Sequence, residues 1–285
     1  MSRIGVDIGA SHISCGVYNN ANGELECKIY QPNRGNINLD IETSTKSFIS
    51  LVIKLIDKLI IENKVSMDTI TSIGLGCPGG IDKENCIFLG SSALNVAQIN
   101  WKNELGKYSK NVFVENDCTC AGICESYVNG IDNFVMFTLG SGLGISYMQD
   151  YKNIKEIVWD ITELNSKIGT KHDRYIRSFE KLSQRYNECK GEVRSRGEIF
   201  KCVENGDLDA KKILNEYIEN FIDGIIKIEE KYSFKKYSIG GGMSEYSRYF
   251  IDKIREKLPN IDVRIAKYKN DSGIIGGALL EEIYI

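Results

Sequence analysis

The chain has 285 residues, of which 42% are hydrophobic and 26% are charged, and its formal net charge is −3 at pH 7. This size allows two domains, each with its own core, and the composition is typical of a soluble globular protein. The negative charge gives no basic surface for nucleic acid, and no apolar stretch approaches the roughly 20 residues that span a membrane. We therefore expect a cytoplasmic protein with no nucleic-acid partner and no membrane segment.

The predicted elements repeat in two halves of the chain. The first half contains predicted strands near 3–8, 13–18 and 25–30, an amphipathic helix from about Thr43 to Asn63, strands at 72–76 and 112–114, and a helix over 117–128. The second half contains predicted strands at 134–139, 144–148 and 155–158, a helix at 208–232, a strand at 236–239 and a helix from Ser244. A strand at 263–266 and a C-terminal helix from about Ser272 complete the chain.

The nine cysteines show no paired Cys-x-x-Cys motif, and three of them, Cys118, Cys120 and Cys124, fall within one predicted helix. Without export, reduced thiols are the expected state, packed as small apolar side chains.

Two glycine turns stand in corresponding places of the two halves. Each follows an apolar strand and precedes another strand, at 8–13 and at 139–145. Glycine permits the turn and lets backbone N–H groups approach a bulky anion. We interpret the pair as a duplicated α/β architecture that holds a polyphosphate. The predicted phosphate-side residues are Gly9, Ala10, Ser11, His12, Gly140, Ser141, Gly142 and Gly144.

Three further features carry candidate chemistry. Asp7 ends the first strand and could organise Mg²⁺ through water beside bound phosphates, or it could bond its own turn. Asp117 follows the strand at 112–114 and could accept a proton from a hydroxyl that attacks a γ-phosphate, or it could cap a helix. The residues Gly240, Gly241 and Gly242 lie between a strand and a helix, where an adenosine group could lie on them.

The ordered set of motifs resembles the ROK family of sugar kinases and sugar-responsive repressors. The segments are Asp7-Ile8-Gly9, Gly74 to Gly79, Trp101, Glu115-Asn116-Asp117, Leu139 to Gly144, Asn205-Gly206-Asp207 and Gly240 to Ser244. The resemblance implies a duplicated, ribonuclease H-like two-domain fold of the actin/hexokinase type, with ATP and Mg²⁺ in an interdomain cleft and a homodimer. It also implies that Asp117 is the catalytic base, that Asn116 and Gly79 contact the sugar, and that Gly140 to Gly144 lie along the phosphates.

On this basis we predict an N-terminal domain of residues 1–116, on which a helix at 272–285 packs, and a C-terminal domain of residues 117–271. The sugar loop between Leu94 and Trp101 is altered, so Asn95 or Asn100 could face a hydroxyl. We favour Asn95, which lies close to the predicted strand end.

The middle of the chain departs from the family pattern. Glu163 falls on the glutamate that similar kinases use to hold sugar hydroxyls, but Asn165 and Ser166 replace the glycine and histidine that should follow. The zinc-binding cysteine cluster of the family is missing, and zinc needs three or four spaced Cys or His ligands. We therefore predict no zinc. Asp173 could replace a second sugar-binding glutamate, or it could cap a helix.

The leading hypothesis is an ATP-dependent kinase that acts on the primary hydroxyl of a hexose or amino sugar. The alternatives are a sugar-sensing regulator and a non-catalytic sugar-binding protein of the same fold. The negative charge and the early first strand argue against DNA binding. The retained Asp7 and Asp117 argue against loss of catalysis.

Overall fold

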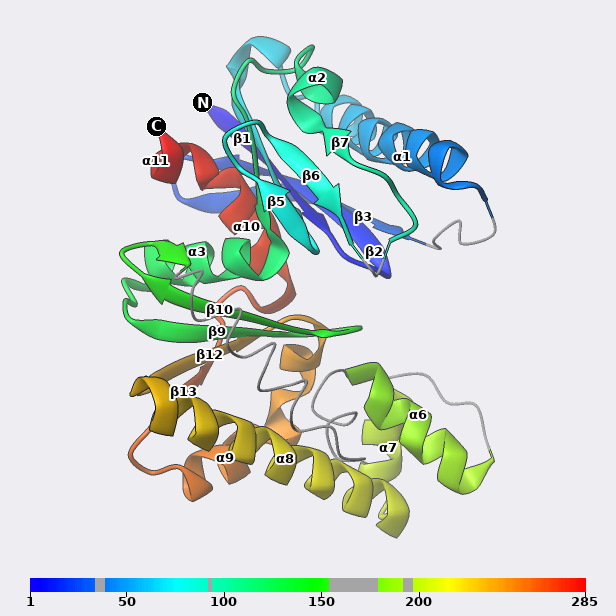
Figure 1. Cartoon of the computed structure of the whole chain (residues 1–285), viewed down its shortest axis with the longest axis vertical. Coiled ribbons are helices and arrows are strands. Elements are labelled where there is room, and N and C mark those ends of the chain that lie inside the picture. The colour runs from blue at the N-terminus through cyan, green and yellow to red at the C-terminus, as the bar shows by residue number, and fades with distance from the viewer. Residues whose placement is uncertain (34–38, 92–93, 154–178, 192–196) are drawn as a thin grey trace. The chain divides into compact units, whose positions relative to one another are not determined.

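The computed structural model describes residues 1–33, 39–91, 94–153, 179–191 and 197–285 (Figure 1). The chain packs into two units: unit 1 contains Met1–Gly130 and Asp271–Ile285, and unit 2 contains Ile131–Asn270. Helix α3 (Asp117–Asn129) packs against α10 (Ser272–Ala278) within unit 1. The boundary between the two units therefore follows Gly130, whereas we predicted from the sequence that it follows Asn116.

The central sheet of unit 1 has five strands in the order β3-β2-β1-β4-β8. Strand β1 is antiparallel to β2 and parallel to β4, and β4 is parallel to β8. The strands are β1 (Ser2–Ile8), β2 (His12–Asn19), β3 (Glu24–Pro32), β4 (Ile70–Cys77) and β8 (Val112–Asn116).

The sheet of unit 2 repeats this arrangement in the order β11-β10-β9-β12-β13. Strand β9 is antiparallel to β10 and parallel to β12, and β12 is parallel to β13. The strands are β9 (Phe134–Leu139), β10 (Leu143–Gln149), β11 (Lys152–Asn153), β12 (Lys236–Gly240) and β13 (Asp262–Ile265). The identical strand order and direction confirm the predicted duplicated α/β fold. The strand predicted at 155–158 lies outside the described residues.

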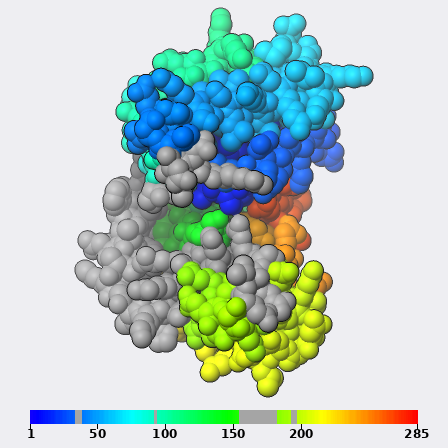
Figure 2. Space-filling view, turned by 90° about the vertical axis from the view of Figure 1, so that its right-hand side faces the viewer, coloured from blue at the N-terminus to red at the C-terminus, as the bar shows by residue number. Residues whose placement is uncertain are grey.

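Helix α1 (Ile41–Glu62) covers unit 1 and begins after Asp40, whose carboxylate accepts the Thr43 N–H at 2.9 Å. One side of α1 is buried, and its outer side forms part of the blue surface in Figure 2. A small sheet of β5 (Gly80–Asp82), β6 (Ile87–Gly90) and β7 (Ile99–Asn100) precedes α2 (Trp101–Leu105). The remaining elements of unit 1 are η1 (Met67–Thr69), α10 and α11 (Leu280–Tyr284).

Unit 2 contains α6 (Phe179–Lys190), α7 (Glu198–Glu204), α8 (Leu208–Tyr232) and α9 (Ile251–Lys257). Helix α8 has the predicted bounds, and Asp207 caps it by accepting the N–H groups of Asp209 and Ala210. The helix predicted from Ser244 is instead a 3₁₀ helix, η2 (Gly242–Tyr249), followed by α9. The Ser244 hydroxyl donates to the Gly241 carbonyl at 2.6 Å and so holds this tighter turn.

Helix α10 lies unusually close to the strands beneath it. A Cβ atom at Gly74 would overlap the carbonyl of Gly277, and one at Gly276 would overlap the carbonyl of Cys120 in α3. Glycine is therefore required where this helix, β4 and α3 meet. All nine cysteines are free thiols. None of the helices in the described ranges has the length and apolar character needed to cross a membrane.

Candidate active site

The parallel strands of unit 1 bring three predicted residues to one edge of the sheet. Asp7 of β1 pairs in register with Gly76 of β4, and Gly76 pairs with Glu115 of β8. Asn116 and Asp117 follow at the carboxyl end of β8, the edge where α/β sheets bind ligands. A Cβ atom at Gly76 would lie 3.2 Å from the Asp117 Cα, so Gly76 leaves the space in which α3 begins.

Asp7 lies in a cluster of negative charge. Burial, together with the charges of Asp117 and Asp271, raises the pKa of Asp7 to about 8. Its carboxylate faces α10, where a Cβ atom at Gly273 would lie 2.7 Å from the Asp7 Cγ. The His12 Nε2 is 3.9 Å from Oδ2 of Asp7.

This environment fits a bound cation, because a cation would stabilise the buried Asp7 carboxylate and offset the nearby charges of Asp117 and Asp271. Mg²⁺ is usually held by one or two carboxylates together with water and substrate phosphates, so a single carboxylate is sufficient. Among the described residues, no three His, Cys, Asp or Glu side chains are grouped to hold a metal ion. The absence of zinc stays a prediction.

Asn116, rather than Asp117, caps α3. Its side-chain oxygen accepts the N–H of Cys118 at 3.1 Å and of Thr119 at 3.3 Å. The alternative that Asp117 caps the helix is therefore wrong. Because the side-chain oxygen of Asn116 is engaged in capping, its Nδ2 group is the part that could donate to a ligand. Burial raises the pKa of Asp117 to about 6, against the lowering effect of the backbone N–H groups of Cys118 and Asp117 itself.

The first glycine turn joins β1 to β2. The Gly9 N–H donates to the His12 carbonyl at 2.8 Å, so this amide closes the turn. The His12 ring stacks on Tyr30 with the centroids 5.3 Å apart, and its Nδ1 lies 3.3 Å from the Ser11 hydroxyl. Ala10 and Ser11 form the half-buried tip between the strands.

Two of the predicted sugar residues also have structural roles. Gly79 has a φ of +115°, and a Cβ atom there would lie 3.0 Å from the Cβ of Ser91. The Asn95 Nδ2 donates to the Leu39 carbonyl at 3.0 Å. The alternative residue, Asn100, caps α2 by accepting the Asn103 N–H at 3.1 Å.

Asn95 lines a pocket of about 380 Å³ within unit 1, between the end of β3, α1 and the loop before β7. The Asn33 side chain joins this pocket to the first glycine turn, because Nδ2 donates to the Gly9 carbonyl at 3.3 Å. The described lining carries no charged side chain. It consists of Gln31, Pro32, Asn33, Ser44, Ser47, Phe48, Leu51, Leu94, Asn95 and Val96.

The second glycine turn belongs to unit 2. The Gly140 N–H donates to the Gly142 carbonyl at 3.0 Å, and Gly144 pairs with Thr138 in β9. A Cβ atom at Gly140 or Gly142 would meet nothing within 4 Å. Among the residues that the structure describes, the space around such a Cβ atom at either glycine is therefore open.

The three consecutive glycines after β12 are not equivalent. Gly241 has a φ of +76°, and a Cβ atom there would lie 2.8 Å from the backbone nitrogen of Leu139. Gly240 belongs to β12, whereas a Cβ atom at Gly242 would meet nothing within 4 Å. Gly241 thus packs against the strand end that precedes the second glycine turn.

Glu163 and Asp173 lie outside the described residues. Sequence reasoning missed Asp271 and Gly273, which contribute to the environment of Asp7. The available signal was the three glycines at positions 273, 276 and 277 within one predicted helix, which are typical of a helix packed against backbone.

The model of the ROK family matches residues 3–155. The chain belongs to the ROK family. It is 25% identical to the N-acetyl-D-glucosamine kinase of Haemophilus influenzae over 96% of the chain and 97% of that protein. It is also 19% identical to the xylose repressor of Caldicellulosiruptor bescii over 96% of the chain and 76% of that protein.

Among solved structures, a ROK family glucokinase from Streptomyces griseus, in complex with glucose and AMPPNP, superposes with a TM-score of 0.78. The identity is 18%, and the alignment covers 98% of the chain and 99% of that structure. At this identity the likeness establishes the fold, which is that of the actin/hexokinase-like ROK proteins. The family contains both kinases and repressors, so activity must be argued from the site.

Proposed function

We propose that this ROK protein is an ATP-dependent kinase that phosphorylates the primary hydroxyl of a neutral hexose or amino sugar. The observation that supports this most directly is Asp117, a carboxylate with a raised pKa at the start of α3, beside Asp7. A base of pKa about 6 is ionised at neutral pH and matches proton transfer better than an ordinary aspartate.

In this proposal Asp117 orients the attacking hydroxyl and accepts its proton as phosphoryl transfer proceeds. Asn116 donates from Nδ2 to a sugar hydroxyl, because its oxygen is already engaged by α3. Asp7 holds Mg²⁺ through water, and the metal neutralises charge on the phosphates when it is bound. The two glycine turns supply backbone N–H groups to the phosphates, and Gly240 to Gly242 lie near the adenosine group.

The pocket that contains Asn95 suits a neutral ligand. Amide and hydroxyl groups can bond sugar hydroxyls, while Phe48, Leu51 and Leu94 offer apolar surface to the C–H faces of a sugar. The Leu94 N–H donates to the Ser91 carbonyl at 3.3 Å, and Ser91 lies against Gly79. We infer that the pocket receives part of the sugar, next to Gly79.

A substrate screen with a pocket-filling variant tests the proposal. ADP release is measured with Mg-ATP and a panel of hexoses, amino sugars and N-acetyl amino sugars. Ser47→Leu, which narrows the pocket, should raise KM for the accepted sugar about tenfold, whereas Ser50→Leu, on the exposed side of α1, should not. Sugar binding without ADP release would favour the sensing alternative. The predicted homodimer is tested separately by light scattering.

A further inference from the structure

Glu115 is a buried carboxylate whose contacts come from three separate parts of unit 1. Its side chain is only 5% exposed. Oε1 accepts the backbone N–H of Asn116 at 2.8 Å, and Oε2 accepts the hydroxyl of Tyr284 at 2.5 Å. The ammonium group of Lys83 pairs with the same Oε2. A buried carboxylate needs such partners, because its charge has lost the solvation of water.

Lys83 and Tyr284 also contact each other. The Lys83 Nζ donates to the Tyr284 hydroxyl at 2.9 Å and lies 5.2 Å from the centre of its ring. Lys83 directly follows β5, the strand that starts beside Gly79, and Tyr284 is the last residue of α11. The three side chains therefore connect the Gly79 hairpin, the end of β8 and the C-terminal helix.

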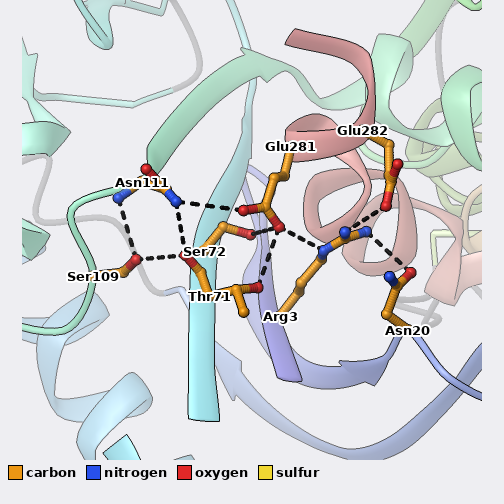
Figure 3. Close-up of polar contacts among 8 residues, drawn as sticks. All are labelled: Arg3, Asn20, Thr71, Ser72, Ser109, Asn111, Glu281 and Glu282. Carbon is orange, nitrogen blue, oxygen red and sulfur yellow. Dashed lines mark hydrogen bonds and ion pairs between the residues drawn. The ribbon is translucent and has the colours of Figure 1, made fainter. Parts of the chain in front are cut away.

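Helix α11 is fixed to the sheet by a second polar cluster (Figure 3). The Arg3 Nε donates to Glu281 at 2.7 Å, and another guanidinium nitrogen of Arg3 bonds Glu282. Glu281 also accepts the hydroxyl of Ser72 at 3.1 Å, which ties it to β4. Glu281 and Tyr284 are three residues apart and lie on neighbouring positions of one helix face. The position of the Tyr284 hydroxyl is thereby set by the sheet.

We propose that Lys83 and Tyr284, acting through Glu115, are positioning residues for Asn116 and Asp117. This inference rests on the proposed kinase function. Glu115 holds the backbone N–H of Asn116, Asn116 caps α3, and Asp117 is the first residue of that helix. A shift of the Glu115 carboxylate would move two residues together: Asn116, the proposed ligand of the sugar hydroxyl, and Asp117, the proposed base. The C-terminal helix thus contributes to catalysis without touching the substrate.

The chain offers a closely matched control. The Tyr108 hydroxyl donates to Asp57 at 2.5 Å, and the Lys107 ammonium lies 4.5 Å from the Tyr108 ring centre. Tyr108→Phe removes the same kind of hydrogen bond as Tyr284→Phe, from a site that we assign no part in catalysis. Lys83→Met removes the counter-charge of Glu115, and Lys83→Arg retains it.

The test compares these variants by amide hydrogen exchange and by steady-state kinetics. Tyr284→Phe should accelerate exchange at the amides of residues 116–119, and Tyr108→Phe should not. Tyr284→Phe should lower kcat about tenfold, the scale of a small misplacement of reacting groups, with KM for ATP within about twofold of the wild type. Lys83→Met should lower kcat further, and Lys83→Arg should restore most of it.

Equal exchange and equal kcat in Tyr284→Phe and Tyr108→Phe would overturn the inference. An equal loss of kcat and of unfolding temperature in both variants would also overturn it, since it would indicate a general structural effect. If the wild type phosphorylates no sugar, the proposed function fails, but the exchange comparison still decides whether Glu115 and its partners hold the segment of Asn116 and Asp117.

Discussion

Alanine substitution at Gly142 should separate the folding role of the second glycine turn from its proposed phosphate role. A Cβ atom at Gly142 would meet nothing within 4 Å. The φ of Gly142 is not in the positive range, so alanine can adopt the native backbone. The free energy of unfolding should therefore stay constant or rise by up to about 1 kcal/mol, because alanine restricts the unfolded chain.

The same substitution should weaken ATP binding, although it leaves the folded state as stable as before or more so. The added methyl group would fill the space through which a phosphate oxygen must approach the backbone N–H groups of the turn. A hydrogen bond to a charged group contributes about 1.5–3 kcal/mol, and each 1.4 kcal/mol changes an equilibrium about tenfold. Loss of one such bond should raise KM for ATP about 10- to 100-fold.

The assay measures chemical denaturation and KM for ATP on the same preparations. Gly224→Ala is the control: Gly224 lies inside α8, and a Cβ atom there also meets nothing within 4 Å. This variant should gain stability and keep its KM for ATP. An unchanged KM for ATP in both Gly140→Ala and Gly142→Ala would refute the phosphate role of the turn.

Four further predictions concern proton transfer, pH-dependent stability, packing and an ion pair. Because Asp117 must be ionised to act as a base and its pKa is about 6, kcat/KM should fall about tenfold per pH unit below about pH 6 rather than below pH 4. The same raised pKa means that the stability contributed by Asp117 is fully present below about pH 4 and is lost as pH rises through about 6, which the pH dependence of denaturation will measure. Gly276→Ala should lower the free energy of unfolding by about 3 kcal/mol or more, because the added Cβ would overlap the Cys120 carbonyl. A denaturation midpoint equal to that of the wild type would contradict the close packing of α10 against α3. Arg3→Met should lower the free energy of unfolding by about 3 kcal/mol, because Glu281 would lose its buried counter-charge. Lys46→Met breaks the exposed pair with Glu42 and should lower it by less than about 0.5 kcal/mol in the same denaturation assay.

Periodicity was sufficient to locate most elements, because burial of one face leaves a regular pattern of apolar residues. Helix α8 begins and ends where the apolar pattern predicted. Strand order could not be derived in the same way, since it depends on contacts between distant segments. The similar glycine turns in the two halves of the sequence indicated duplication. The corresponding strand orders of the two five-stranded sheets confirm it.

At the candidate site, the sequence was sufficient to locate the segment that contains Asn116 and Asp117. It was not sufficient to assign a separate role to each residue. Whether Asn116 or Asp117 caps α3 is a one-residue question, and both side chains can cap a helix. The glycine at position 79 raised a similar ambiguity, because a positive φ and a close ligand both favour glycine. The roles of Lys83 and Tyr284 were hidden, since they depend on contacts with Glu115 across 32 and 169 positions respectively.

We propose above all that this ROK protein transfers a phosphoryl group to a sugar hydroxyl with Asp117 as the base. The most direct measurement is mass spectrometric detection of sugar phosphate formed from Mg-ATP by the wild type and by Asp117→Asn, with ³¹P NMR to locate the phosphate. Sugar phosphate carrying its phosphate on the primary hydroxyl is expected from the wild type, and about 100- to 10,000-fold slower formation from Asp117→Asn. Equal rates from the two proteins, or no sugar phosphate from the wild type with any sugar of the panel, would contradict the claim.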